Sequence, residues 1–191
     1  MYTEFEATFA NISKSSVRKL LRKAGAKLVR KEFMQKRAVF HLPKGHEIQG
    51  GWLRVRDEAD KITMSLKIVN GGKIEDQKEV QLKVDNFEVA VEFLATIGCI
   101  KKAFQESKRE LWVLDDVEIT IDEWPFLEPF IEIEGKSEHE VKGVAQKLGF
   151  DYTKAKFGAV DILYSEKYSV TEDRINNHTP EILFEGLNPF L

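Results

Sequence analysis

The chain has 191 residues and a mass of 22.0 kDa, the size of one domain or at most two small ones. Charged residues make up 32% of it, above the usual figure of about 25%, yet 29 basic and 32 acidic residues leave a net charge of only −3. This balance argues against a general nucleic-acid coat, and the single cysteine, Cys99, excludes an internal disulfide or a cysteine-rich metal site. With no membrane-length apolar run and no basic signal-peptide start, we expect a soluble, cytoplasmic protein.

Strand and helix patterns follow one another through the first half of the chain. Ser13 is a candidate N-cap for the first helix, and Gly25 is its stop. The PKG and GG sequences at 43–45 and 50–51 predict turns. The predicted elements are a strand over 2–10, a helix over 14–24, a long strand over 27–42, strands over 52–56 and 61–69, a strand within 74–84 and a helix over 86–97.

Strands return between residues 99 and 134, with clear alternation in 116–122 and 130–134. The sequence SEHE at 137–140 is a capping box that opens a third helix. A short helix around 160–168 and an apolar PEILF sequence finish the chain. No low-complexity segment or linker interrupts it, so we predict one domain over residues 1–191. About eight strands and three or four helices predict an α+β fold with mostly antiparallel strands.

Pairs of like charge recur at i, i+2 spacing in these strands, each pair flanked by apolar residues. The pairs are Glu4 with Glu6, Arg54 with Arg56, and Glu132 with Glu134. Side chains at i and i+2 of a strand point the same way, about 6.5 to 7 Å apart. Any one pair is consistent with a solvated strand face, because antiparallel sheets often keep one face in water. Three pairs, with Lys67 and Asp122 on similar strands, instead favour charged faces that converge.

A sheet closed into a barrel would turn these charged faces into its lumen. The lumen would then hold the acids Glu4, Glu6, Asp122, Glu132 and Glu134 and the bases Arg54, Arg56, Lys67 and Arg109. Buried carboxylates without partners are costly, so such a cluster invites divalent cations, and oxygen ligands suit Mg²⁺ or Mn²⁺. Arginine forks match phosphate oxygens, and lysine supplies a compact positive charge. Together these groups are the minimum needed to hold a metal–polyphosphate.

Six motifs occur in an order that points to a known family. They are EFEAT at 4–8, WLRVR at 52–56, SLK at 65–67, SKRE at 107–110, ITID at 119–122 and PFIEIEG at 129–135. Together they resemble the CYTH superfamily, the triphosphate tunnel metalloenzymes, from Glu4 to about Tyr164. That superfamily includes class IV adenylyl cyclases, thiamine triphosphatases and inorganic triphosphatases. The resemblance implies a closed eight-stranded antiparallel β-barrel, the triphosphate tunnel, with helices packed outside.

The resemblance also implies roles for the charged residues. By similarity, the metal ions would be held by Glu4, Glu6, Asp122, Glu132 and Glu134, of which Glu4, Glu6 and Asp122 would also be catalytic. The phosphates would be gripped by Arg54, Arg56, Lys67 and Arg109. We therefore expect a hydrolase of inorganic or organic triphosphates that depends on Mg²⁺ or Mn²⁺. We expect no nucleic-acid or membrane partner, and a homodimer remains open because members of such families are often dimers.

Two positions depart from the family pattern, and they keep other functions open. Thr8 stands where the opening motif has a lysine, and Ser107 stands where many members have one. Lys154 or Lys156 is a candidate to supply the charge that Thr8 lacks. One alternative is a class IV adenylyl cyclase that makes cyclic AMP and pyrophosphate from ATP. Others are a catalytically weak module that binds a triphosphate or nucleotide, and a structural protein whose paired charges are solvated.

Overall fold

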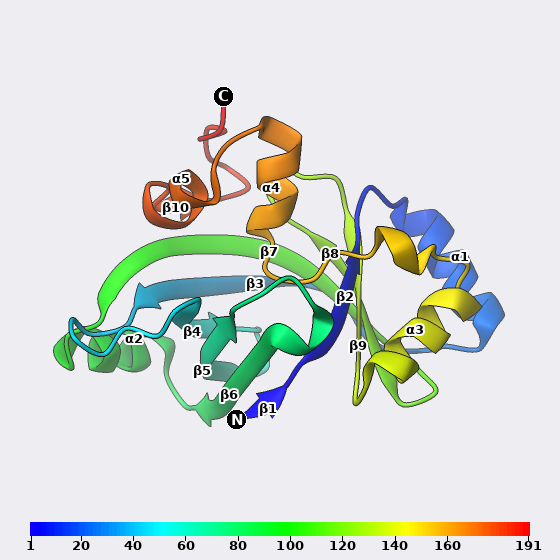
Figure 1. Ribbon diagram of the computed structural model, residues 1–191, viewed down its shortest axis with the longest axis horizontal. Helices are drawn as coiled ribbons and strands as arrows, with labels where there is room; N and C mark the ends of the chain where they lie inside the picture. The colour runs from blue at the N-terminus through cyan, green and yellow to red at the C-terminus, as the bar shows by residue number, and fades with distance from the viewer.

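The computed structural model describes residues 1–191, and its main feature is a sheet rolled into a ring (Figure 1). Neighbouring strands follow the order β1-β6-β5-β4-β3-β7-β8-β9-β2. The strands are β1 (Tyr2–Thr3), β2 (Phe5–Phe9), β3 (Lys27–His41), β4 (Gly51–Asp57), β5 (Ile62–Val69), β6 (Gln77–Val84), β7 (Ile100–Leu114), β8 (Val117–Glu123), β9 (Phe130–Gly135) and β10 (Glu181–Ile182).

The N-terminal segment closes the ring because its two halves pair with different strands. β1 is antiparallel to β6, and β2 is antiparallel to β9. The break falls at Glu4, whose N–H donates a hydrogen bond of 2.9 Å to the carbonyl of Gln77. The strand predicted over 2–10 is therefore two strands, so the path has nine strands instead of the expected eight. The antiparallel barrel of an α+β protein is otherwise confirmed, and β10 adds a parallel pair to β7.

The helices pack outside the ring (Figure 1). The first begins and ends where the sequence predicts, since Ser13 accepts a hydrogen bond from the Ser16 N–H and Gly25 has a φ of 87°. The last α-helix, α5, is the one that the sequence patterns do not predict. The helices are α1 (Lys14–Ala24), α2 (Phe87–Thr96), α3 (Glu138–Lys147), α4 (Asp161–Tyr168) and α5 (Glu172–Asn177), with 3-10 turns η1 (Ile74–Asp76) and η2 (Tyr152–Lys154).

The apolar faces of the strands point outward and form the core beneath these helices. On β8 and β9, Ile121 and Ile133 are fully buried and share a cluster with Leu21 of α1 and Val141 of α3. A separate cluster on β3 and β4 packs under α2. Because side chains alternate along a strand, an apolar outer face leaves the other face to line the lumen. The packing thus directs the charged faces inward.

The C-terminal part of the chain lies over β7 (Figure 1). Its apolar side chains form a third buried cluster. Trp124 packs there with Tyr164 of α4, whose hydroxyl donates a hydrogen bond of 2.7 Å to the carbonyl of Pro125. Ile175 of α5 and Ile182 of β10 complete this side of the barrel, and both also line the cavity described below. Residues after 161 are therefore part of the wall around the lumen.

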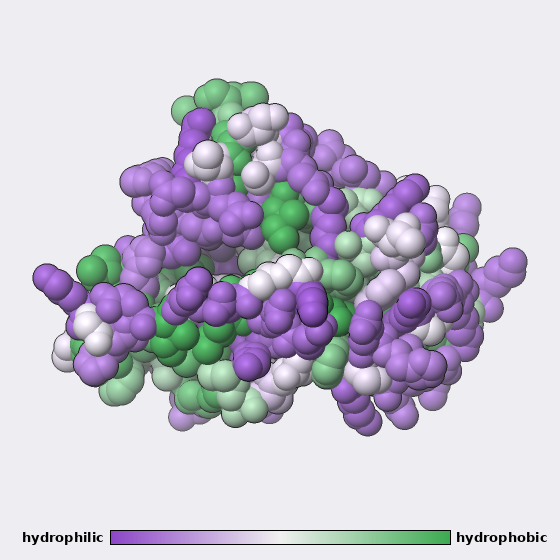
Figure 2. Space-filling model, viewed as in Figure 1, coloured by the Kyte–Doolittle hydropathy of each residue, from purple (hydrophilic) through white to green (hydrophobic).

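Charged and polar residues cover most of the face shown in Figure 2, where apolar residues form separate patches. This agrees with a composition that is 32% charged. None of the helices has both the length and the apolar character required to cross a membrane.

Candidate functional site

The lumen of the barrel contains a cavity of about 1210 Å³. Most of the charged residues expected from strand alternation line it, and one lies just behind its wall. Asp122 is that residue, because it is fully buried against Arg109. Those on the wall are Glu4, Glu6, Arg54, Arg56, Lys67, Arg109, Glu132 and Glu134. The structure thus brings the sequence-predicted residues together in one site.

Acidic and basic side chains project into the lumen from different strands of the ring. One pair of glutamates, Glu132 and Glu134, lies on β9, next to the N-terminal segment that carries Glu4 and Glu6. The arginine pair lies on β4, and Lys67 lies on the neighbouring β5. When β1 and β2 count as one position, β4 is four places from β9 in a ring of eight, which is across the lumen. A wall rich in carboxylates therefore faces a wall of bases.

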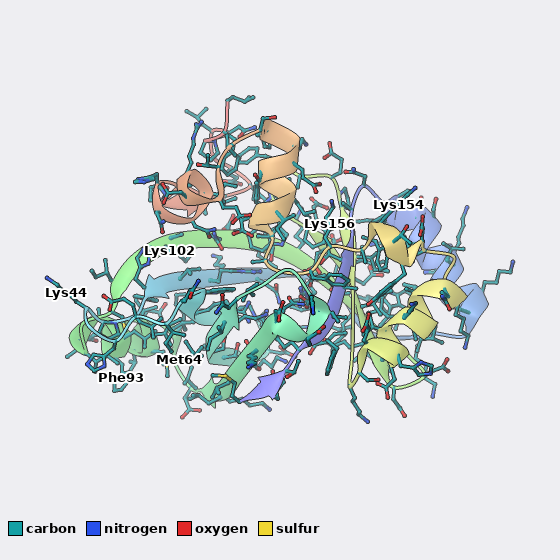
Figure 3. The ribbon with its side chains drawn as sticks, in the orientation of Figure 1. Lys44, Met64, Phe93, Lys102, Lys154 and Lys156 are labelled. Atoms are coloured by element: carbon teal, nitrogen blue, oxygen red, sulfur yellow. The ribbon has the colours of Figure 1, made fainter.

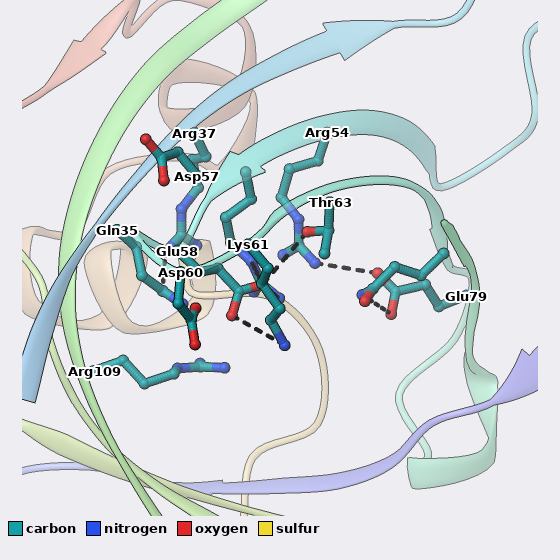
Figure 4. Close-up of polar contacts among 12 residues, drawn as sticks. Gln35, Arg37, Arg54, Asp57, Glu58, Asp60, Lys61, Thr63, Glu79 and Arg109 are labelled. Carbon is teal, nitrogen blue, oxygen red and sulfur yellow. Dashed lines mark hydrogen bonds and ion pairs between the residues drawn. The ribbon is translucent and has the colours of Figure 1, made fainter. Parts of the chain in front are cut away.

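The bases on β4 are held by two carboxylates that the sequence patterns do not identify (Figure 4). Arg54 Nη2 lies 3.1 Å from Oε1 of Glu79, and Arg56 Nη2 lies 2.9 Å from Oε1 of Glu58. Burial would raise the pKa of Glu79, but Lys67 and Arg54 outweigh it and lower that pKa to about 2. Both arginines are therefore positioned by charged partners from within the lumen.

Arg109 on β7 joins the two walls. Its Nε lies 2.7 Å from Oδ1 of Asp122, and its Nη2 lies 2.6 Å from Oε2 of Glu132. The other oxygen of Asp122 accepts hydrogen bonds from Arg109 Nη2 at 3.0 Å and from the Thr120 hydroxyl at 2.6 Å. Burial would lower the pKa of Arg109, but the two carboxylates outweigh it and raise that pKa. Asp122 is thus fully engaged in holding Arg109.

Two other carboxylates, Glu6 and Glu134, have no basic partner and face each other directly across β2 and β9. Glu118 of β8 pairs with Glu134 in register, so three acidic side chains form a row. Burial raises the pKa of Glu6 to about 7, with Glu4 and Glu134 adding to the shift. Burial likewise raises the pKa of Glu134 to about 7, with Glu4 and Glu118 adding to it. Adjacent like charges in a sheet are destabilising, so this row favours a cation.

Glu132 belongs to the same wall. Burial and, to a smaller extent, the nearby Glu6 and Asp122 raise its pKa to about 8. No three carboxyl, imidazole or thiol groups gather around one point, so the carboxylates form an open wall and not a closed cage. Mg²⁺ commonly takes one or two carboxylates and completes its shell with water and substrate phosphates. The oxygen donors of an open wall fit Mg²⁺ or Mn²⁺ bound together with a phosphate ligand.

The sequence patterns miss Arg37, Glu58, Glu79 and Glu118, which also line the cavity. Alternation along the strands could have identified two of them. Glu79 points to the face of β6 opposite to that of the apolar Val80, and Glu118 shares a face of β8 with Asp122. Arg37 is harder to find, because β3 shifts register against β7 at three places. Each such irregularity can change which side chains face inward.

Thr8 does not line the main cavity. It borders a separate void of about 10 Å³ together with Glu132 and Lys156. The Thr8 N–H donates a hydrogen bond of 2.9 Å to the carbonyl of Lys156, so that segment covers the edge of β2. Both lysines lie on the segment between α3 and α4 (Figure 3). The Lys156 ammonium pairs with Glu166, and the Lys154 side chain is 80% exposed. Neither lysine lines the main cavity, where the charge missing at Thr8 would be expected.

Several solved structures share this fold. A conserved hypothetical protein from Pyrococcus furiosus has a TM-score of 0.69 and 22% identity, covering 84% of this chain and 99% of its own. A candidate adenylate cyclase from Vibrio parahaemolyticus has a TM-score of 0.72 and 12% identity, covering 86% and 98%. A candidate adenylyl cyclase from Hippeastrum, described as revealing a dominant triphosphatase activity, has a TM-score of 0.57 and 14% identity, covering 88% and 97%.

No curated protein sequence matches the chain. At these levels of identity, the structural likeness establishes the fold. The family model of the CYTH domain, however, matches residues 4–161, which span both walls of the lumen. The chain therefore belongs to the CYTH family.

Proposed function

We propose that this CYTH protein is a hydrolase of triphosphates, inorganic or organic, that depends on Mg²⁺ or Mn²⁺. One observation carries the proposal: the unpaired carboxylates Glu6 and Glu134 lie across the lumen from the arginines of β4. A metal–triphosphate complex carries both complementary charges, positive on the ion and negative on the phosphates. It would neutralise the two walls at once.

On the basic wall, Arg54, Arg56 and Lys67 would bind phosphate oxygens. Each now contacts a carboxylate, so a phosphate would share or replace those partners. Arg109 would bind a further oxygen while its Nε stays on Asp122. Such preorganised donors stabilise negative charge that develops as a phosphoryl group is transferred.

On the acidic wall, Glu6 and Glu134 have no basic partner and would bind the ion directly. Glu4 and Glu132 pair with Lys67 and Arg109 and would add negative charge beside it. When bound, the ion would polarise the phosphoryl oxygens and lower the pKa of an attacking water. Burial gives Glu6 a pKa of about 7 in the metal-free protein, and a bound ion would lower that pKa, so Glu6 would be an ionised oxygen ligand near neutral pH. Asp122 was expected to be catalytic and to bind the metal, and its contacts favour a role in positioning Arg109.

A class IV adenylyl cyclase is the second candidate function, because the cavity is large enough for a nucleotide. The volume of about 1210 Å³ exceeds the usual range of roughly 300–1,000 Å³ for small-ligand pockets, so a nucleotide as well as an inorganic triphosphate would fit. The third candidate is a module that binds triphosphate without turnover, because Thr8 stands where the family pattern has a lysine. The three candidate functions differ in the products that they release.

The test is to incubate the purified protein with tripolyphosphate, ATP or thiamine triphosphate, each with Mg²⁺, Mn²⁺ or EDTA. We expect inorganic phosphate to be released only with metal. Cyclic AMP and pyrophosphate from ATP would support the cyclase instead, and tight binding without product would support the module. Absence of both binding and turnover for all three substrates would refute the proposal.

Two variants connect the activity to the site. Glu134→Gln removes a negative oxygen donor at nearly constant shape, so metal-dependent turnover should fall by more than about tenfold. Glu92→Gln makes the same chemical change on the exposed face of α2 and serves as the matched control. Equal activity of the two variants would exclude Glu134 from the metal site.

A further inference from the structure

Three buried N–H donors in or beside the lumen have no hydrogen-bond acceptor. They are Nε2 of Gln35, Nε of Arg37 and Nε of Arg54. The residues are only 0%, 6% and 9% exposed, respectively, so water does not easily satisfy these donors. Leaving a buried donor without an acceptor is unfavourable, and such groups in folded proteins call for an explanation. All three come from the neighbouring strands β3 and β4.

Arg37 differs from Arg54 because no carboxylate pairs with its guanidinium group. The other arginines that line the cavity each have a carboxylate within 3.1 Å; they are Arg30, Arg54, Arg56 and Arg109. Arg37 instead donates from Nη2 to Oε1 of Gln35 at 2.9 Å and to the hydroxyl of Ser107. Its guanidinium carbon lies 4.2 Å from the ring centroid of Trp124.

These neighbours orient the guanidinium but do not neutralise it. Ser107 also donates a hydrogen bond of 3.1 Å to Oε1 of Gln35, so the three side chains form a closed polar group. Burial lowers the pKa of Arg37 well below its ordinary value, and the nearby Arg54 and Arg56 lower it further. A buried charge with like-charged neighbours is unfavourable unless an anion accompanies it.

We propose that Arg37, oriented by Gln35 and Ser107, binds one phosphate group of the substrate on the basic wall. Arg37 lines the main cavity, and in Figure 4 Arg37, Arg54 and Arg109 lie around the same part of the lumen. β3 is four places from the N-terminal segment in the ring, so Arg37 approaches from the strand opposite Glu6. The unpaired donors around Arg37 fit an anion with several oxygens. Arg37 would thus add a phosphate contact to the four predicted from the sequence.

This inference rests on the proposed function, but its test uses binding and needs no turnover. Titration calorimetry in EDTA would measure the Kd of tripolyphosphate for the parent protein and for Arg37→Gln. A charge-assisted hydrogen bond to phosphate corresponds to a loss of about ten- to a hundredfold in affinity. Lys36→Gln is the matched control, because it removes a positive charge one residue away on the exposed face of β3.

We expect the Kd to rise at least tenfold in Arg37→Gln and to change less than about twofold in Lys36→Gln. Arg37→Lys keeps the charge but not the fork, so it should lie between the parent and Arg37→Gln. An unchanged Kd in Arg37→Gln, or equal weakening in Lys36→Gln, would overturn this inference alone. A parent protein that neither binds nor turns over tripolyphosphate, ATP or thiamine triphosphate, with or without Mg²⁺, would overturn the proposed function as well.

A second measurement covers the case in which Arg37→Gln does not fold. In the parent protein, the Nε–H resonance of Arg37 can be assigned by its loss in the spectrum of Arg37→Lys. Titration with tripolyphosphate should shift that resonance, whereas an arginine that only packs on Trp124 would keep its position. An Arg37 resonance that stays fixed while the ligand binds would show that the guanidinium does not contact phosphate.

Discussion

Raising the pH of the metal-free protein from about 5 to about 8 is expected to lower its free energy of unfolding, because Glu6 must then ionise inside the lumen. Burial, with Glu4 and Glu134, raises the pKa of Glu6 to about 7 from an ordinary value of 4.5. Between these values the folded protein binds more protons than the unfolded chain, so stability decreases as the pH rises. The contribution of Glu6 is present below about pH 4.5 and is lost by about pH 7.

The magnitude follows from the distance between the two pKa values. They differ by about 2.5 pH units, and each unit corresponds to about 1.4 kcal/mol, so a shift of this size corresponds to roughly 3 to 4 kcal/mol. Glu132 and Glu134 titrate in the same range but share the same repulsion, so the three effects do not add. Mg²⁺ favours the ionised carboxylates and should therefore restore stability at high pH.

Urea unfolding at pH 5, 6, 7 and 8, in EDTA and in Mg²⁺, measures this effect. The decline in EDTA should be smaller in Mg²⁺ and should flatten in Glu6→Gln, which cannot ionise. Glu92→Gln, on the exposed face of α2, should keep the slope of the parent protein. A stability that stays constant or rises with pH in EDTA would refute the reasoning, as would an unchanged slope in Glu6→Gln.

The sequence predicts the inward-facing charges well because the side-chain period of a strand is two. In β9, Ile131 and Ile133 are fully buried in the core while Glu132 and Glu134 line the lumen, as the alternation of PFIEIEG indicates. The same reasoning places Arg54 and Arg56 on the wall. Each of these strands is short and keeps an unbroken register with its neighbours.

The features that the sequence does not predict depend on contacts between distant segments. Glu4 breaks the first strand because β1 and β2 pair with opposite edges of the sheet, 77–84 and 130–135. Arg37 faces inward on a strand with register shifts, and its partner Ser107 is 70 residues away. Local alternation carries no information about either pairing, so the broken strand and the unpaired arginine emerge only from the fold.

Three further substitutions test the packing, the positioning and the departure from the family pattern. Ile133→Ala should lower the free energy of unfolding by about 2–5 kcal/mol, measured in urea, because Ile133 is fully buried; a loss under 1 kcal/mol would contradict that packing. Asp122→Asn should raise the KM for tripolyphosphate more than about tenfold through loss of Arg109 orientation, without changing the Mg²⁺ concentration for half-maximal activity. A change in that Mg²⁺ concentration would instead make Asp122 a metal ligand.

The third substitution is Thr8→Lys. From the sequence, Thr8 shares a strand face with Glu4 and Glu6, so a lysine there would be expected to reach the phosphates. The structure gives it only about 10 Å³ beside a segment that is hydrogen-bonded to Thr8, about the space of one water molecule. The longer side chain must displace that segment, so we expect a loss of about 1–3 kcal/mol in the free energy of unfolding and no gain in tripolyphosphate affinity. Urea unfolding and calorimetry on the same preparations decide the matter, since a variant with parental stability and tenfold tighter binding would show that a lysine at this position does reach the main cavity.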